Sequence, residues 1–143
     1  MKTYAVRLLP NQDLMQELEK IVKENNIKAG FIVSCLGSLK KAHLRMPGGK
    51  TFQNFEGQFE ILCLNGTLSV NGSHLHVAMS VFPEGNVLGG HLLEEGCIIA
   101  TTAEVIIGAL EDMEFERELD ENTGFKELKV LKKSEKGFMN RLQ

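Results

Sequence analysis

Residues 71–82 read Asn-Gly-Ser-His-Leu-His-Val-Ala-Met-Ser-Val-Phe. Both residues of the Asn71-Gly72 pair tolerate a positive φ, so the pair is typical of a two-residue turn between antiparallel strands. After the turn, apolar residues alternate with polar or small ones. One face carries Leu75, Val77, Met79 and Val81, and the other carries His74, His76, Ala78 and Ser80. The stretch therefore predicts a β-strand with one buried face in an antiparallel sheet.

One helix is predicted ahead of this strand. Four apolar residues recur at offsets of four, seven and eight and form one helical stripe: Leu14, Leu18, Ile21 and Val22. Turn residues up to Asp13 supply helix-start chemistry, and Asn25-Asn26 is expected to end the helix. A short strand over 4–9 precedes it. After residue 29 the helical period disappears, and short β-rich pieces follow over 31–36, 41–46, 51–56, 58–64 and 97–110.

The order of these elements predicts the fold class. A strand, a helix and then many short strands indicate a single α+β domain, with a mostly antiparallel β-sheet and one main N-terminal helix. We place this domain at residues 1–130. Residues 111–121 are mostly acidic and residues 126–141 mostly basic, and such charge runs are typical of solvated edges. Residues 131–143 are expected to form a basic C-terminal tail, for which order and disorder both stay open.

Composition and charge bound the function. The 143 residues are 43% hydrophobic, which is enough for one core. The net charge of −3, from 16 basic and 19 acidic residues, disfavours a bulk electrostatic grip on nucleic acid or on an anionic membrane. Three widely spaced cysteines favour reduced thiols and a cytoplasmic location. No segment approaches the ~18 apolar residues of a membrane span.

The strongest sign of chemistry is the pair His74 and His76. Residues two apart on a strand project from the same face, so both imidazoles can reach one cation while Leu75 packs into the core. His91 is a third candidate ligand. Three neutral imidazoles with one open position form a known type of zinc site. The alternative also stays open, in which two histidines lie exposed on a polar sheet face and the third is an unrelated loop residue.

Glu104 is the second unusual residue, because it interrupts the uncharged stretch from Ala100 to Ile107. A buried carboxylate must be paired, hydrogen-bonded, bound to metal or protonated. In a functional role Glu104 is a candidate general base acting on a metal-bound water. In a structural role it is satisfied by backbone or by a partner chain. The sequence holds no nucleophile elbow, His-Glu-x-x-His helix or Gly-x-Gly-x-x-Gly loop, so familiar hydrolase and nucleotide signatures are absent.

Five motifs occur in an order and spacing that resemble those of the PPC domain, the plant and prokaryote conserved domain. They are GQFEIL at 57–62, NGTLS at 65–69, HLH at 74–76, GGHL at 89–92 and TTAEV at 101–105. The resemblance runs from about residue 4 to about residue 115. The chain resembles a prokaryotic member of the family, and such members typically consist of the domain alone.

The resemblance implies a fold, an assembly and a metal site. Members of the family fold as one α+β domain with a mainly antiparallel sheet and associate as homotrimers. Carried onto this sequence, the family's histidines are His74, His76 and His91, which implies a metal site with zinc as the occupant. In plants the domain is joined to AT-hooks that bind DNA, while the domain itself mediates assembly and contact with transcription factors. This sequence has no Arg-Gly-Arg-Pro core of an AT-hook, which argues against direct DNA binding.

The resemblance also marks three candidate partner-binding residues, Gln58, Phe59 and Glu60. The plant motif usually reads Gly-Arg-Phe-Glu-Ile-Leu, whereas Gln58 takes the arginine position here. Recognition that depends on that guanidinium does not carry over. Gln58 and Glu60 fall on the strand face opposite Phe59, where Glu60 is able to pair with a neighbouring protomer.

Three hypotheses for function follow. The first is a cytoplasmic homotrimeric binding and assembly module, with a three-histidine zinc site, a regulatory association with protein or DNA, and no turnover. The second is a zinc-dependent hydrolase or lyase that uses a metal-bound water and Glu104. The third is direct binding of duplex DNA through the lysine-rich C-terminal segment, which we rank below metal binding. No membrane partner is expected.

Overall fold

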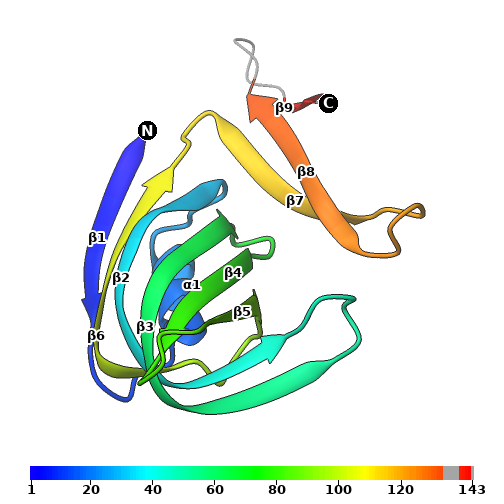
Figure 1. Cartoon of the computed structure of the whole chain (residues 1–143). Coiled ribbons are helices and arrows are strands. Elements are labelled where there is room, and N and C mark those ends of the chain that lie inside the picture. Colours follow the sequence, from blue (N-terminus) through cyan, green and yellow to red (C-terminus); the bar gives the residue numbers. More distant parts are fainter. Residues whose placement is uncertain (134–138, 143) are drawn as a thin grey trace.

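Antiparallel strands dominate the computed structural model, which describes residues 1–133 and 139–142 (Figure 1). The larger sheet has the strand order β1-β6-β2-β3-β4-β5. Its strands are β1 (Lys2–Leu8), β2 (Gly30–Arg45), β3 (Phe52–Leu68), β4 (His74–Val81), β5 (Val87–Leu92) and β6 (Ile98–Ala109). A smaller sheet contains β7 (Met113–Leu119), β8 (Lys126–Lys133) and β9 (Met139–Leu142). With α1 (Leu14–Glu24), the single helix of the described residues, this arrangement confirms the α+β class.

Helix α1 begins where the sequence predicts. The Asp13 side chain accepts hydrogen bonds from the backbone N–H groups of Met15 and Gln16, which satisfies two donors that the first turn leaves free. Leu14, Leu18 and Val22 are fully buried and join the core cluster formed with the larger sheet. The apolar stripe therefore holds α1 against one face of that sheet, as Figure 1 shows.

Strand β4 confirms the alternation that predicted it. Leu75, Val77 and Met79 are buried, whereas His74 and His76 are half-buried and exposed. The histidines therefore lie on the face of the larger sheet opposite α1 and the core. This leaves the imidazoles free for a ligand.

Several predicted strand limits are wrong. The pieces at 31–36 and 41–46 form one strand, β2, and those at 51–56 and 58–64 form β3. Gly37, which falls between two of the predicted pieces, lies inside β2 near a register shift with β6. A Cβ atom there would lie 2.2 Å from the Thr102 carbonyl oxygen, so the glycine permits close strand contact instead of a chain break.

The acidic and basic runs also form strands. Residues 113–119 and 126–133 pair as β7 and β8, with acidic and basic positions opposite one another, such as Glu116 and Lys129. Such opposite-charge pairs support an antiparallel ladder. Of the expected C-terminal tail, residues 131–133 complete β8 and 139–142 form β9, while residues 134–138 and 143 lie outside the described residues. The domain limit at residue 130 stays a prediction.

Two polar side chains fasten β7 to the larger sheet. The buried Ser69 hydroxyl lies 2.8 Å from the Lys28 carbonyl oxygen and 3.0 Å from that of Phe115, so its single proton is shared between two acceptors. Asn71 also donates to the Phe115 carbonyl. These bonds hold β7 at Phe115, two residues ahead of Arg117. Among the described residues, no helix has the length and apolar character needed to cross a bilayer.

Candidate metal centre

Cross-strand register brings the three histidines together. His76 on β4 lies directly opposite His91 on β5, and His91 in turn lies opposite Arg45 at the end of β2. His74 is two residues from His76, on the same face of β4. Side chains directly opposite one another on a sheet face are close neighbours. The pairing of β2 with β5 therefore completes a row of His76, His91 and Arg45 across three strands.

Gly89 lets β5 approach closely enough for this row to form. A Cβ atom at Gly89 would lie only 2.3 Å from the Val77 carbonyl oxygen of β4, a distance that real side chains do not adopt. From the sequence, a loop position for His91 stayed open. The structure places His91 in β5, where the interior Gly89 allows close backbone contact with β4.

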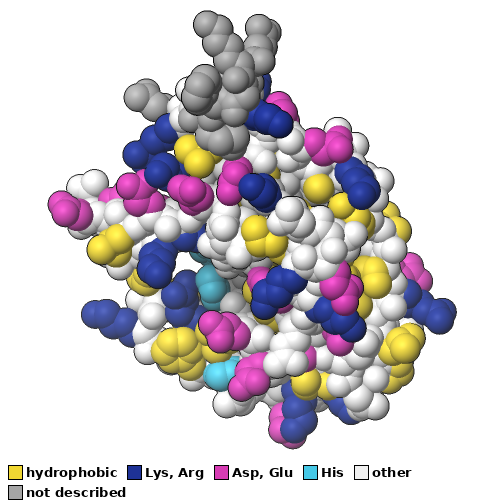
Figure 2. Space-filling model, turned by 180° about the vertical axis from the view of Figure 1, so that it is seen from behind, with side chains coloured by type: hydrophobic (Ala, Val, Ile, Leu, Met, Phe, Trp, Pro, Cys, Tyr) yellow, Lys and Arg dark blue, Asp and Glu magenta, His cyan; other side chains and the backbone are white. Residues whose placement is uncertain are grey.

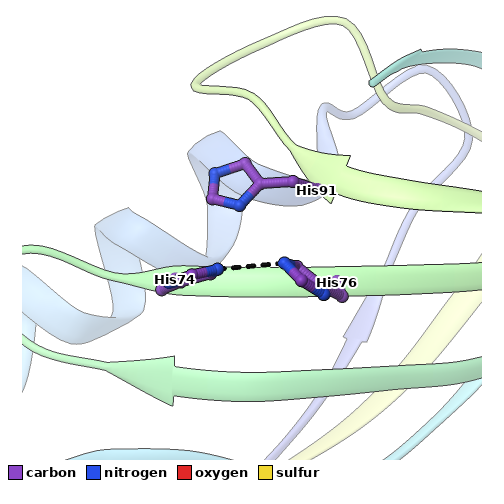
Figure 3. A group of neighbouring side chains, drawn as sticks. All are labelled: His74, His76 and His91. Atoms are coloured by element: carbon purple, nitrogen blue, oxygen red, sulfur yellow. Dashed lines mark hydrogen bonds between the residues drawn. The ribbon is translucent and has the colours of Figure 1, made fainter. Parts of the chain in front are cut away.

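The imidazole nitrogens are spaced for a shared cation. One ring nitrogen from each of His74, His76 and His91 lies within 4.8 Å of the other two. The Nε2 atoms of His74 and His76 are 2.9 Å apart, close to the roughly 3.3 Å that separates two nitrogens on a tetrahedral zinc ion. Figure 3 shows these two rings side by side on β4, with the His91 ring extending toward them from β5. The predicted ligands are therefore brought together.

Burial and positive charge favour the neutral forms of His91 and His74. Burial, followed by the charge of Arg45, lowers the pKa of His91 to about 4. Burial also lowers the pKa of His74, with further contributions from His76, Arg117 and Arg45. A metal ion needs the lone pair of a neutral imidazole, so this environment favours the ligand form of both rings at neutral pH.

A cavity of about 730 Å³ opens beside the histidines. The tip of the β2–β3 hairpin, including Arg45 and Gly49, forms one wall, and Arg117 of β7 with Phe125 and Glu127 forms another. Figure 1 shows the two hairpins on either side of β4 and β5. Figure 2 shows a histidine side chain in a hollow bordered by Lys and Arg side chains. The three histidines therefore lie in the wall of a space large enough for a small molecule.

Two arginines at the site, Arg45 and Arg117, were not predicted from the sequence. Arg45 Nη2 lies 3.1 Å from His91 Nδ1, and Arg117 Nη2 donates to the Thr67 hydroxyl at 2.6 Å. Both guanidiniums reach the site through long-range strand pairing, which no local pattern encodes. The one available signal was Arg117 itself, since it is the single basic residue within the acidic run at 111–121.

Glu104 is not brought to the histidines. It lies on β6, opposite Arg7 of β1 and Leu36 of β2, and its side chain is exposed instead of buried. Strands β2 and β3 separate β6 from β4, and neighbouring strands lie about 4.8 Å apart. Glu104 is also absent from the residues that line the cavity. Its role as a catalytic base stays a hypothesis without support from this placement.

The three candidate partner-binding residues are divided between surface and core. Gln58 and Glu60 are exposed on β3 and line a pocket of about 220 Å³ together with Phe82. Phe59 is buried and belongs to the core. Only the first two side chains are therefore available to a partner without unfolding.

Comparison with known proteins gives a family and a curated relative. The family model described as the Plants and Prokaryotes Conserved (PCC) domain matches residues 1–111. The chain is also 40% identical over 135 residues to the bifunctional protein GlmU of Synechococcus sp. (strain JA-3-3Ab). That match covers 94% of this chain but 21% of the relative, so the chain spans about a fifth of its length.

Solved structures share this fold. A hypothetical protein from Salmonella enterica matches with a TM-score of 0.88 and 39% identity, over 93% of this chain and 95% of that chain. A metal-containing protein from Archaeoglobus fulgidus matches with a TM-score of 0.73 and 29% identity, over 89% and 92%. The predicted family resemblance is confirmed by these findings together with the family match.

Proposed function

Because the chain belongs to the Plants and Prokaryotes Conserved domain family, we propose that it is a homotrimeric binding and assembly module with a metal site on His74, His76 and His91. The observation that carries the proposal is the convergence of three imidazole nitrogens within 4.8 Å in the wall of a cavity. The description of the Archaeoglobus fulgidus structure as metal-containing supports a metal in this fold.

The donor set favours zinc. Three neutral nitrogens suit zinc, whereas magnesium and calcium prefer oxygen ligands. The cavity lies on the open side of the three rings, so a fourth ligand is able to enter from it. Such a three-histidine set with one free position is typical of a zinc ion that binds exogenous molecules.

Native mass spectrometry of untagged protein, purified without chelator and then exposed to zinc, tests the proposal. We expect a trimer with one metal ion per chain. His76→Ala should keep the trimer and weaken zinc binding by at least about tenfold, because even the loss of a ligand's supporting contact costs that much.

His43→Ala is the matched control, since His43 is half-buried, lies outside the cluster and should leave the zinc content unchanged. A wild-type chain that stays free of zinc would contradict the metal site. A monomer would contradict the assembly.

Self-association is supported by exposed apolar side chains on the sheet face opposite α1. Leu36 on β2, Leu62 on β3 and Ile106 on β6 lie on adjacent strands around Glu104, and we name these three apolar residues the outer apolar surface. A contiguous exposed apolar area is typical of an interface. Glu104 beside such a surface fits the structural alternative, in which a partner chain satisfies the carboxylate.

The zinc-dependent hydrolase or lyase ranks second. Among the described residues that line the cavity, Glu127 is the single carboxylate, and Glu104 is separated from the histidines by two strands. A general base must lie within direct or one-water reach of its proton. The hypothesis that Glu104 serves as this base therefore has no geometric support.

Direct DNA binding ranks third. Lys129 of the lysine-rich segment forms ion pairs with Glu116 at 3.3 Å and with Glu118 at 3.5 Å. These acids on β7 reduce the positive charge that β8 could present to phosphates. A regulatory association with a protein partner through Gln58 and Glu60, and the cytoplasmic location, stay predictions.

A further inference from the structure

The cavity beside the histidines is positively charged although the chain as a whole is not. In the part of the chain that the structure describes, Arg45, Arg117 and Lys126 line it against the one carboxylate of Glu127, whereas the net charge of the chain is −3. Neither arginine forms an ion pair with any residue that the structure describes. A divalent metal ion on three neutral imidazoles adds further positive charge. Such a half-buried group of cations is stabilised by an anion.

The bond between Arg45 and His91 fixes where His91 holds its proton. A guanidinium only donates hydrogen bonds, so His91 Nδ1 must be the acceptor of the 3.1 Å contact. Neutral His91 then carries its proton on Nε2. The lone pair that a metal ion would need is the one that Arg45 already occupies.

Metal binding by His91 must therefore break this hydrogen bond. If the metal ion takes Nδ1, it replaces Arg45 directly. If it takes Nε2, the proton of the neutral ring moves to Nδ1, which then has no lone pair for Arg45. In both cases the Arg45 guanidinium becomes free while it still lines the cavity.

We infer that the cavity binds a small organic anion, whose carboxylate or phosphate group is held by Arg45 and Arg117, and that metal binding at His91 releases Arg45 for this contact. The inference rests on the proposed metal site. Guanidiniums are the side chains best suited to planar, bidentate contact with carboxylate and phosphate oxygens.

Arg117 and the size of the cavity support the same ligand class. The bond from Arg117 to Thr67 anchors one nitrogen of its guanidinium and leaves other donors for a ligand. The cavity volume of about 730 Å³ falls within the range typical of small-molecule sites. The centre of the Phe125 ring lies 5.5 Å from the guanidinium carbon of Arg45. This ring offers an apolar wall for the carbon skeleton of the anion.

Calorimetric titration tests the inference on wild-type, Arg45→Gln and Arg141→Gln chains. Zinc is first titrated into each metal-free protein in a buffer without carboxylate or phosphate. Succinate and methyl phosphate are then titrated separately into the zinc-loaded and metal-free forms. Comparing the two ligands distinguishes a carboxylate from a phosphate as the anionic group. Arg141→Gln is the control, because it removes a guanidinium that is exposed on β9 and outside the cavity.

Two opposite effects of Arg45→Gln are expected. Zinc should bind roughly two- to tenfold more tightly without anion, because a like charge and a charge-assisted hydrogen bond to His91 are gone. The zinc-loaded variant should bind the preferred anion roughly ten- to a hundredfold more weakly than wild type, because a charge-assisted contact is gone. Arg141→Gln should match wild type in both titrations.

Two results would overturn the inference while leaving the metal site intact. One is equal anion affinity for zinc-loaded wild-type and Arg45→Gln chains. The other is a zinc affinity of Arg45→Gln that is no higher than that of wild type, which would contradict competition at His91. A wild-type chain that binds no zinc at all would instead overturn the proposed function, and with it the release of Arg45.

Discussion

Cys35 and Cys97 are buried thiols whose surroundings keep them protonated. Burial is the largest cause in both, and it raises the pKa of Cys35 to about 12 and that of Cys97 to about 11 from the usual 9.0. The thiolate is the reactive form of cysteine, so these two residues are chemically inert in the folded chain. Cys63 is exposed and differs from both.

The two buried thiols should therefore resist alkylation until the chain unfolds. In a Cys63→Ser background, iodoacetamide at pH 8 is expected to label essentially no thiol in the native protein and both thiols in denaturant, as measured by intact mass. Rapid native labelling of either cysteine would contradict their burial.

The same shifts give a pH dependence of stability with a definite sign. Between the unfolded value near 9 and the folded values, the folded chain holds protons that the unfolded chain has lost. The contribution of these thiols to the free energy of unfolding is therefore fully present below pH 9 and falls as the pH rises toward 11. Denaturant titrations across this pH range should show a smaller decline in the free energy of unfolding for Cys35→Ala than for the wild-type chain.

At the scale of elements, β5 owes its place to a glycine. Gly89→Ala would put a Cβ atom 2.3 Å from the Val77 carbonyl oxygen, and backbone on both strands would have to move. We expect a loss of about 1–3 kcal/mol in stability and weaker zinc binding, because His91 moves with β5. Thermal unfolding of the metal-free protein and a zinc titration measure the two effects.

Gly57→Ala is the matched control for that change. It makes the same substitution within a strand, but its Cβ atom would meet only the Phe59 ring, at 3.3 Å. We expect a small change in stability and no change in zinc affinity. If both variants bind zinc like wild type, β5 does not position His91 in the way that the register indicates.

Sequence patterns predicted some elements and missed others for physical reasons. Strand β4 was predicted because its alternation is local, and α1 because its stripe and Asp13 cap are local. Strand β5 was missed because its two central glycines have low strand propensity, and their value depends on contact with β4 and β2. Strand β2 was divided because Gly37 looks like a turn residue until β6 lies against it.

The candidate site shows the same division. His74 and His76 were predicted because strand geometry puts residues two apart on one face. His91 was named as a third candidate, but no local pattern linked it to the other two, since its cross-strand contact is set by the pairing of β4 with β5. Arg45 and Arg117 were missed because β2, β5 and β7 meet only in the folded chain. Electrostatic partners of a site are thus harder to predict than its same-strand ligands.

For the whole molecule, the proposed trimer depends on what covers the outer apolar surface. Leu36 belongs to this surface and is 61% exposed in the single chain. Leu119 on β7 lies outside the surface and is 64% exposed, so the two leucines differ in location but have similar exposure. Leu36→Glu would place a second carboxylate opposite Glu104. In an assembled trimer that charge would be buried beside a like charge, which is strongly unfavourable.

We therefore expect Leu36→Glu to dissociate the trimer at micromolar concentration, while Leu119→Glu leaves it intact, as measured by sedimentation velocity. Both variants should keep the fold, because each side chain is exposed in the single chain and surface substitutions usually change stability by less than about 0.5 kcal/mol. If Leu36→Glu stays trimeric, the subunits meet on another surface and Glu104 is not satisfied by a partner. If the Leu36→Glu monomer still binds one zinc ion, the histidine site is complete within one chain, and assembly and metal binding are separate properties of the domain.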